Sequence, residues 1–315
     1  MTLPSPSRRT FIKNLAAAAS LPCLATTARA QAESESNRRA DEPHTILNCN
    51  IRVPLPADEA AGRGWAARRE ACIAIIRARR PDLICLQEVI REPLRDLERA
   101  LPEFASFGFA GPEMDARLVG YHGIAKNVIL YSRDRYSMIS AGGFWLSETP
   151  HLPGTMSWDS ARARHVNWVR LQNGRSGAEF RLLTTHLDHQ GQRAREEQMR
   201  MIVEESASYA PEFPQVLAGD FNANARNPVL RIATEDGWAD THAAIHGAAD
   251  SGFSYHGFLG ADYATKSPPE KQKGRIDFIL ARGPIRTLAS ELVRDRHEGR
   301  YPSDHYFLSA RVAFV

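Results

Sequence analysis

From His44 onward the chain alternates short apolar runs with amphipathic stretches. The stretch 65–79 has its tryptophan, cysteine and isoleucines on one side and arginines on the other, which is the period of an amphipathic helix. Pro81 ends that helix, and the apolar run 83–86 follows as a buried strand. The same criteria predict strands at residues 45–51, 83–86, 128–131, 136–141, 166–171, 180–185, 215–218, 275–281, 288–293 and 306–312, and helices at residues 65–79, 91–100, 190–205 and 228–236.

The order of these elements predicts the fold class. Between residues 128 and 185 the strand-like segments follow one another closely, which is typical of antiparallel pairing rather than of parallel strands joined by helical crossovers. Strands and helices are mixed along the whole length, and no internal repeat or long linker divides them. We therefore expect one α/β domain over residues 44–315, with two stacked sheets and helices outside them.

Residues 1–30 have a different pattern and are not expected to belong to the fold. Ser-Arg-Arg-Thr-Phe-Ile-Lys at residues 7–13 precedes an apolar run at 14–24, and Ala-Arg-Ala at 28–30 has the small residues of a cleavage site. The paired arginines indicate a twin-arginine export signal. The run is shorter than the roughly 20 residues of a membrane-spanning helix. A lipidated Cys23 is a weaker alternative because Pro22 precedes it. The sequence thus predicts an exported protein, periplasmic or secreted, with no stable membrane span.

Residues 31–43 are polar and aperiodic, as in a flexible linker after a cleavage site. The whole chain is 43% hydrophobic, which excludes the fibrous and disordered classes. Its net charge is +3, but residues 31–315 hold 36 basic and 37 acidic residues, a net charge of −1. This balance disfavours tight nonspecific binding to long nucleic acids, which usually requires a basic excess, although a local basic groove remains compatible with it.

Three cysteines follow the leader, and each lies in an apolar context: Cys49, Cys72 and Cys85. Buried free thiols are the favoured interpretation. A Cys49–Cys85 disulfide is the alternative if their two strands are neighbours, because an exported protein can form disulfides.

Polar side chains interrupt the apolar pattern where predicted strands end. They are Asn50, Gln87, Glu88, His186, Asp188, Asp220, Asn222, Asp277, Asp304 and His305. Carboxylates and amides at the ends of several buried strands can converge on one mouth of a sheet system. Such an oxygen-rich cluster suits a hard divalent cation and a phosphate group.

Each of these positions also has a purely structural interpretation. Asn50 fits a turn, Glu88 a helix cap, and Gly-Asp-Phe-Asn at 219–222 a tight turn. Asp277 fits an internal ion pair, and Asp304 a cap before the last strand. Separate structural roles of this kind do not readily explain why all of these residues occur in this order along the chain.

That order resembles the endonuclease/exonuclease/phosphatase superfamily of deoxyribonuclease-like enzymes. The shared series is Asn, Gln-Glu, Thr-His, Gly-Asp-Phe-Asn, Arg-Ile-Asp-Phe and Ser-Asp-His, and it spans residues 50–305 here. The resemblance implies a four-layer α/β/β/α sandwich, in which two stacked mixed sheets are flanked by helices. It also implies a divalent-metal-dependent phosphoesterase that uses Mg²⁺, with Mn²⁺ as an alternative.

The same resemblance assigns roles to the metal side of the site. Glu88 is expected to ligate the metal with help from Asn50 and Asp304. In-line attack on a phosphoester places negative charge on the phosphoryl oxygens, and a cation with one or two carboxylates neutralises it.

On the catalytic side, the resemblance implies that Asp220 and Asn222 position the attacking water and the phosphoryl oxygens. His305 is expected to act with Asp277 as an Asp–His pair. His186 lies where deoxyribonuclease-like members have a second catalytic histidine and abasic-site endonucleases a tyrosine, so the sequence disfavours the abasic-site branch.

Four further residues are candidates for substrate binding: His122, Asn127, Arg164 and His189. The segment around Phe-Trp-Leu-Ser-Glu at 144–148 and Arg164 resembles a poorly characterised bacterial subgroup of the superfamily. The polar loop 266–273, just before Asp277, is a further place for substrate specificity.

The sequence therefore predicts a phosphodiesterase or phosphomonoesterase, and does not distinguish the two. An extracellular nuclease acting on scavenged nucleic acid and a sphingomyelinase-like phospholipid hydrolase are alternatives within the superfamily. A binding module that has lost its chemistry is the alternative from another class, but all eight expected metal and catalytic positions carry competent side chains.

Overall fold

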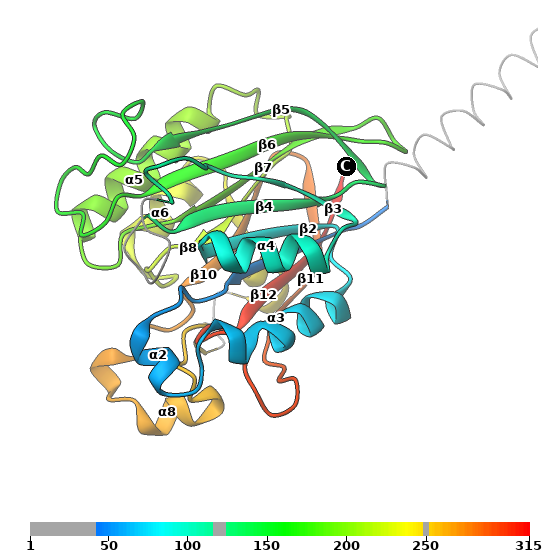
Figure 1. The fold of residues 1–315 in the computed structure, drawn as a ribbon. Helices are drawn as coiled ribbons and strands as arrows, with labels where there is room; N and C mark the ends of the chain where they lie inside the picture. Colours follow the sequence, from blue (N-terminus) through cyan, green and yellow to red (C-terminus); the bar gives the residue numbers. More distant parts are fainter. Residues whose placement is uncertain (1–41, 116–123, 248–251) are drawn as a thin grey trace, which may run out of the picture. The chain divides into compact units, whose positions relative to one another are not determined.

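The computed structural model describes residues 42–115, 124–247 and 252–315 (Figure 1). At its centre are two six-stranded mixed sheets, as expected. The strand order is β11-β12-β1-β2-β4-β3 in the first sheet and β5-β6-β7-β8-β10-β9 in the second. The expected leader 1–30, residues 31–41 of the expected linker and His122 lie outside the described residues.

The first sheet consists of β1 (His44–Asn50), β2 (Leu83–Val89), β3 (Phe104–Phe107), β4 (Lys126–Ser132), β11 (Ile285–Val293) and β12 (Phe307–Phe314). The second consists of β5 (Tyr136–Trp145), β6 (His165–Asn173), β7 (Glu179–His186), β8 (Gln215–Asp220), β9 (Ala239–Asp240) and β10 (Asp277–Arg282). Pairing is parallel between β1 and β2 and between β7 and β8, and antiparallel between the other paired strands.

The helices are α2 (Pro56–Ala60), α3 (Trp65–Arg79), α4 (Arg91–Ala100), α5 (Gln192–Ser206), α6 (Pro228–Glu235), α7 (Thr241–His246) and α8 (Tyr263–Lys266). Short 3₁₀ turns lie at η1 (Gly260–Asp262) and η2 (Pro269–Lys271). Within the described ranges, none of the helices has both the length and the apolar character needed to cross a membrane.

Three apolar clusters separate the four layers. The first, which includes Ile46, Leu182 and Ile279, fills the space between the sheets. The second packs the outer face of the first sheet against α3 and α4. The third packs the outer face of the second sheet against α5 and α6 (Figure 1). Strands buried on both faces explain why the sequence shows short continuous apolar runs instead of strict alternation.

The cysteines are buried and free, and the alternative disulfide is ruled out by the register of two neighbouring strands. In the β1–β2 pair Cys49 lies opposite Leu86, and Asn48 lies opposite Cys85. Cys49 therefore faces the helices while Cys85 faces the space between the sheets. Their side chains point to opposite faces, so they cannot be bridged.

Candidate active site

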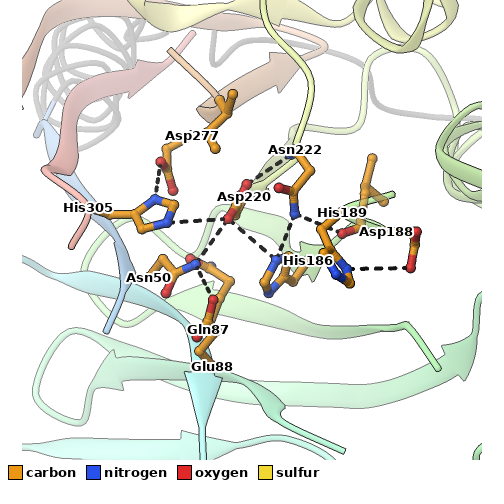
Figure 2. A network of polar contacts seen from close by, with 12 residues as sticks. Asn50, Gln87, Glu88, His186, Asp188, His189, Asp220, Asn222, Asp277 and His305 are labelled. Atoms are coloured by element: carbon orange, nitrogen blue, oxygen red, sulfur yellow. Dashed lines mark hydrogen bonds and ion pairs between the residues drawn. The ribbon is translucent and has the colours of Figure 1, made fainter. Parts of the chain in front are cut away.

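The strand register brings the predicted residues of the second sheet together. In the parallel β7–β8 pair His186 lies opposite Asp220, and in the antiparallel β8–β10 pair Asp277 lies opposite the same Asp220. In the first sheet Asn50 ends β1 beside Gln87 of β2, one residue before Glu88. The polar ends of the two sheets meet at a single cluster (Figure 2).

Asp220 is at the centre of this cluster. Its Oδ2 accepts a hydrogen bond from Asn50 Nδ2 at 3.0 Å and lies 3.4 Å from His186 Nε2 and 3.8 Å from His305 Nε2. Its Oδ1 accepts from the backbone N–H of Asn222 at 2.9 Å. Burial and the charge of Asp277 raise the pKa of Asp220 to about 7, so this carboxyl can exchange a proton near neutral pH.

His305 forms an Asp–His pair with Asp277. Its Nδ1 lies 2.8 Å from Asp277 Oδ2, and both side chains are buried. Burial alone would lower the pKa of His305, but Asp277, Asp220 and Asp304 outweigh it and raise the pKa to about 10. The pair therefore holds an imidazolium at neutral pH, with its second ring nitrogen directed at Asp220 (Figure 2).

Glu88 is held in a backbone conformation that non-glycine residues rarely adopt, with a φ of 62° where the β2–β4 pairing is irregular. Its two carboxylate oxygens accept hydrogen bonds from Asn50 Nδ2 at 3.0 Å and from the backbone N–H of Val53 at 2.8 Å. Burial would raise the pKa of Glu88, but the Val53 hydrogen bond, the charge of His305 and the Asn50 hydrogen bond lower it. Glu88 thus presents an ionised carboxylate beside Asp220.

The donor set fits a hard divalent cation. Ligand atoms of Glu88, His186 and Asp220 lie within 4.8 Å of one another, as do those of Asp220, Asp277 and His305. Two ionised or ionisable carboxylates, Glu88 and Asp220, offer the oxygen ligands that Mg²⁺ and Mn²⁺ prefer.

The other two predicted metal residues, Asn50 and Asp304, make polar contacts of their own next to these ligand groups. Asn50 Oδ1 accepts from the backbone N–H of Arg52 at 3.1 Å, so its amide nitrogen faces the two carboxylates. Asn50 therefore links the Glu88 and Asp220 carboxylates through its amide nitrogen. Asp304 Oδ2 lies 3.1 Å from Arg52 Nη1, and Asp304 belongs to neither of the close ligand groups.

His186 and Asn222 form the opposite side of the cluster. Asn222 Nδ2 lies 2.9 Å from His186 Nε2, and Asn222 has a positive φ of 48° that turns the chain sharply after β8. Burial and the nearby charge of Arg164 lower the pKa of His186 well below its usual value. The site therefore combines a neutral histidine on this side with a charged one, His305, on the other.

A cavity of about 570 Å³ opens over the cluster. Arg164 and His189 line it, as expected for substrate-binding residues, and so do Lys271 and Lys273 at the end of the predicted specificity loop. Asn127 does not. Its side chain is buried and donates to the backbone oxygen of His165 at 2.8 Å, so its role is structural.

Several residues at the site carried no signal in the sequence. Arg52, Arg162 and Tyr255 line the cavity, and Tyr255 packs edge-on against His305 with ring centroids 5.2 Å apart. Behind the cluster, Asn48 Oδ1 and Thr184 Oγ1, which also carried no signal, accept from Nε2 of the predicted Gln87 at 2.8 and 3.0 Å, and this links the two sheets. The sequence could not single out Arg52, Arg162 or Asn48, because arginines in loops and asparagines within strands have many other uses.

Comparison with known proteins agrees with this architecture. The chain is 30% identical to an uncharacterised protein of Acanthamoeba polyphaga mimivirus over 130 residues, which is 38% of this chain and 18% of the viral protein. A mannosyl-6-phosphatase from Bacteroides thetaiotaomicron superposes with a TM-score of 0.74 at 24% identity, covering 86% of this chain and 100% of the other. TDP2 of D. rerio, solved with a single-strand DNA product, gives a TM-score of 0.62 at 16% identity over 86% of this chain and 99% of its own.

These two structural likenesses establish the fold. The model of the Endonuclease/Exonuclease/phosphatase family matches residues 47–305, which run from β1 to the Ser-Asp-His segment before β12. Enzymes of this family are divalent-metal-dependent hydrolases of phosphoesters. The chain therefore belongs to the endonuclease/exonuclease/phosphatase family.

Proposed function

We propose that this protein is an exported hydrolase of phosphoesters that depends on Mg²⁺ or Mn²⁺. The observation that carries the proposal is the surrounding of Asp220, a buried carboxyl whose pKa is raised to about 7 and which lies between a charged histidine and a neutral one. Perturbed acid–base groups at the base of a cavity are typical of active sites.

In this proposal Glu88 would hold the divalent cation, with Asn50 and Asp304 beside it, and the cation would supply positive charge against the negative charge that builds up on the phosphoryl oxygens. Asp220 orients the attacking water and accepts its proton, as a carboxyl with a pKa near 7 can. Asn50 keeps the Glu88 and Asp220 carboxylates in place through two 3.0 Å hydrogen bonds from one amide nitrogen.

The remaining polar groups lie around the phosphoryl group. His305, kept positively charged by Asp277, donates towards the negative charge of the transition state, and the Asn222 amide, which donates to Nε2 of the neutral His186, lies on the opposite side. Removing one such donor is expected to lower kcat on the order of 100-fold. A non-catalytic binding role would not require this opposed pair of histidines.

Hydrolysis of p-nitrophenyl phosphate and bis(p-nitrophenyl) phosphate tests the proposal and separates monoesterase from diesterase activity. We expect turnover that EDTA abolishes, that Mg²⁺ or Mn²⁺ restores, and that His305→Ala lowers. His246→Ala is the matched control, because His246 lies on α7, outside the cavity. Turnover that is indifferent to both EDTA and His305→Ala would disprove the mechanism.

A further inference from the structure

Three cations line the cavity beyond His186 and take no part in the proposed reaction at Asp220. We call them the cationic wall: Arg162, Arg164 and Lys273. Arg164 lies 3.4 Å from His189 through its Nη2, and His189 follows β7 three residues after His186. The wall is therefore on the same side of the site as His186 and Asn222, where Figure 2 shows His189 and Asp188.

A buried carboxylate builds this wall. Asp188 is fully buried, and its Oδ2 accepts from the backbone N–H groups of Ala161 and Arg162 at 2.9 and 3.1 Å. Its Oδ1 accepts from the N–H groups of Gln190 and Gly191 at 2.9 and 2.8 Å. Asp188 thus fastens the loop that carries Arg162 to the end of β7, and this explains its position next to the predicted Thr-His element.

The charge balance of this side of the cavity is positive. Arg164 Nε forms an ion pair with Asp188 Oδ2 at 3.9 Å, and backbone N–H groups donate to the same carboxylate oxygen. Burial and the charges of Arg164, Arg162 and Lys273 lower the pKa of His189, against the opposing charge of Asp188. The charges of all three cations therefore reach the imidazole ring of His189. Glu270 also lines the cavity, next to Lys271, so one acidic side chain offsets part of the charge of this loop.

We propose that the cationic wall binds a second anionic group of the substrate, so that this enzyme prefers phosphoesters that carry a further phosphate beyond the scissile one. The inference rests on the proposed function and specifies its substrate class. Arginine guanidinium groups match phosphate geometry, and a cavity of about 570 Å³ has the size of a small-molecule site. The second phosphate could come from a small bisphosphorylated molecule or from the terminal phosphate of a short strand, and both are phosphate monoesters with the same dianionic chemistry.

Two substrate pairs test the proposal and distinguish these sources. The first compares kcat/KM for fructose 1,6-bisphosphate and fructose 6-phosphate, and the second compares the dinucleotide TpT with and without a 5′-phosphate. We expect the compound with the second phosphate to be favoured at least about 10-fold in one of the pairs, chiefly through a lower KM. The pair that shows the preference identifies the source.

Variants then assign the preference to the wall. Arg162 and Lys273 are exposed, so Arg162→Gln and Lys273→Gln are expected to fold normally, and together they should reduce the ratio about 10-fold. Arg231→Gln is the control, because Arg231 is an exposed arginine of α6 that pairs with Glu235 and lies outside the cavity. A ratio near one in the unmodified protein, or a ratio that the double variant leaves unchanged, overturns the proposal.

Binding separates this inference from the proposed function. Calorimetric titration of the metal-free protein with fructose 1,6-bisphosphate, fructose 6-phosphate and the two dinucleotides requires no turnover. If neither these four esters nor the two p-nitrophenyl phosphates are hydrolysed, but one doubly phosphorylated ligand binds more tightly than its partner and Arg162→Gln/Lys273→Gln removes the difference, the hydrolase proposal fails and the anion site stands. Equal binding within both pairs would overturn the anion site.

Discussion

Replacing Asp277 by asparagine removes the charge that keeps His305 protonated. The side chains remain nearly isosteric, so Asn48 Nδ2, 3.5 Å from Asp277 Oδ1, and the backbone contact to Ser254 are retained. What changes is the partner of His305 Nδ1 at 2.8 Å. In the unmodified protein, a pKa raised to about 10 from an ordinary 6.5 corresponds to about 5 kcal/mol in favour of the imidazolium, net of burial.

Asp277 is the largest of the charges that raise this pKa, so we expect the pKa of His305 in Asp277→Asn to fall towards or below neutral. Burial then favours the neutral imidazole, and the positive charge facing the phosphoryl group is lost. Because Asp277 acts through His305, kcat should fall on the order of 100-fold, by no more than the loss expected for His305→Ala. NMR titration of the imidazole resonances in the metal-free protein measures the pKa, and steady-state kinetics with p-nitrophenyl phosphate measures kcat.

The double variant Asp277→Asn/His305→Ala makes the test selective. If Asp277 acts through His305, the double variant should lose little more activity than His305→Ala alone, because residues that act as one unit are not additive. Additive losses would mean that Asp277 has a separate role. An unchanged pKa of His305 in Asp277→Asn, or a kcat within threefold of the unmodified protein, would refute the electrostatic account of the pair.

Three further predictions concern the metal, acid stability and export. Glu88→Gln removes a charged ligand while keeping its shape, and should weaken Mg²⁺ binding on the order of 100-fold, as measured by calorimetric titration. Burial lowers the pKa of His165 to about 3. Below pH 6.5 the unfolded chain therefore binds one more proton at this histidine than the folded chain does. From this residue alone, the free energy of unfolding should fall by about 1.4 kcal/mol per pH unit between about pH 6 and 4. Urea unfolding should show that His165→Asn flattens this dependence, whereas exposed His151→Asn does not. Arg8→Lys with Arg9→Lys should retain the protein in the cytoplasm on cell fractionation, and continued export would exclude the twin-arginine route.

The sequence was most informative where a polar or charged residue directly follows a buried apolar run. Apolar runs predicted strands at nearly the observed places because those strands are buried on both faces, and polar residues at their ends were conspicuous for the same reason. Asp220 and Asp277 could be identified in this way, since an acid at the end of an apolar run needs a local explanation. The short elements β3, β9, α2, α7 and α8 were not predicted, because segments of two to six residues contain too little periodicity.

The orientation of individual side chains could not be predicted. The sequence places Asn50 near the metal but does not show that the backbone N–H of Arg52 fixes its amide with the nitrogen towards Glu88 and Asp220. Nor does it show that Arg52, whose φ is 61°, folds back to lie 3.1 Å from Asp304. Both outcomes depend on the turn after β1, whose left-handed conformation at an arginine no sequence pattern indicates.

The division of the site between two sheets has a consequence for its rigidity. Glu88 comes from the first sheet and Asp220 from the second, so the distance between their carboxylates depends on how the sheets pack. Asn50 spans that junction with two 3.0 Å hydrogen bonds, and Gln87 does the same one layer behind it through Thr184. A left-handed backbone at Glu88 costs on the order of 1 kcal/mol and persists only where the surroundings fix it. Here the Val53 N–H and the Asn50 amide fix it, so the packing of the sandwich itself sets the geometry of the carboxylates.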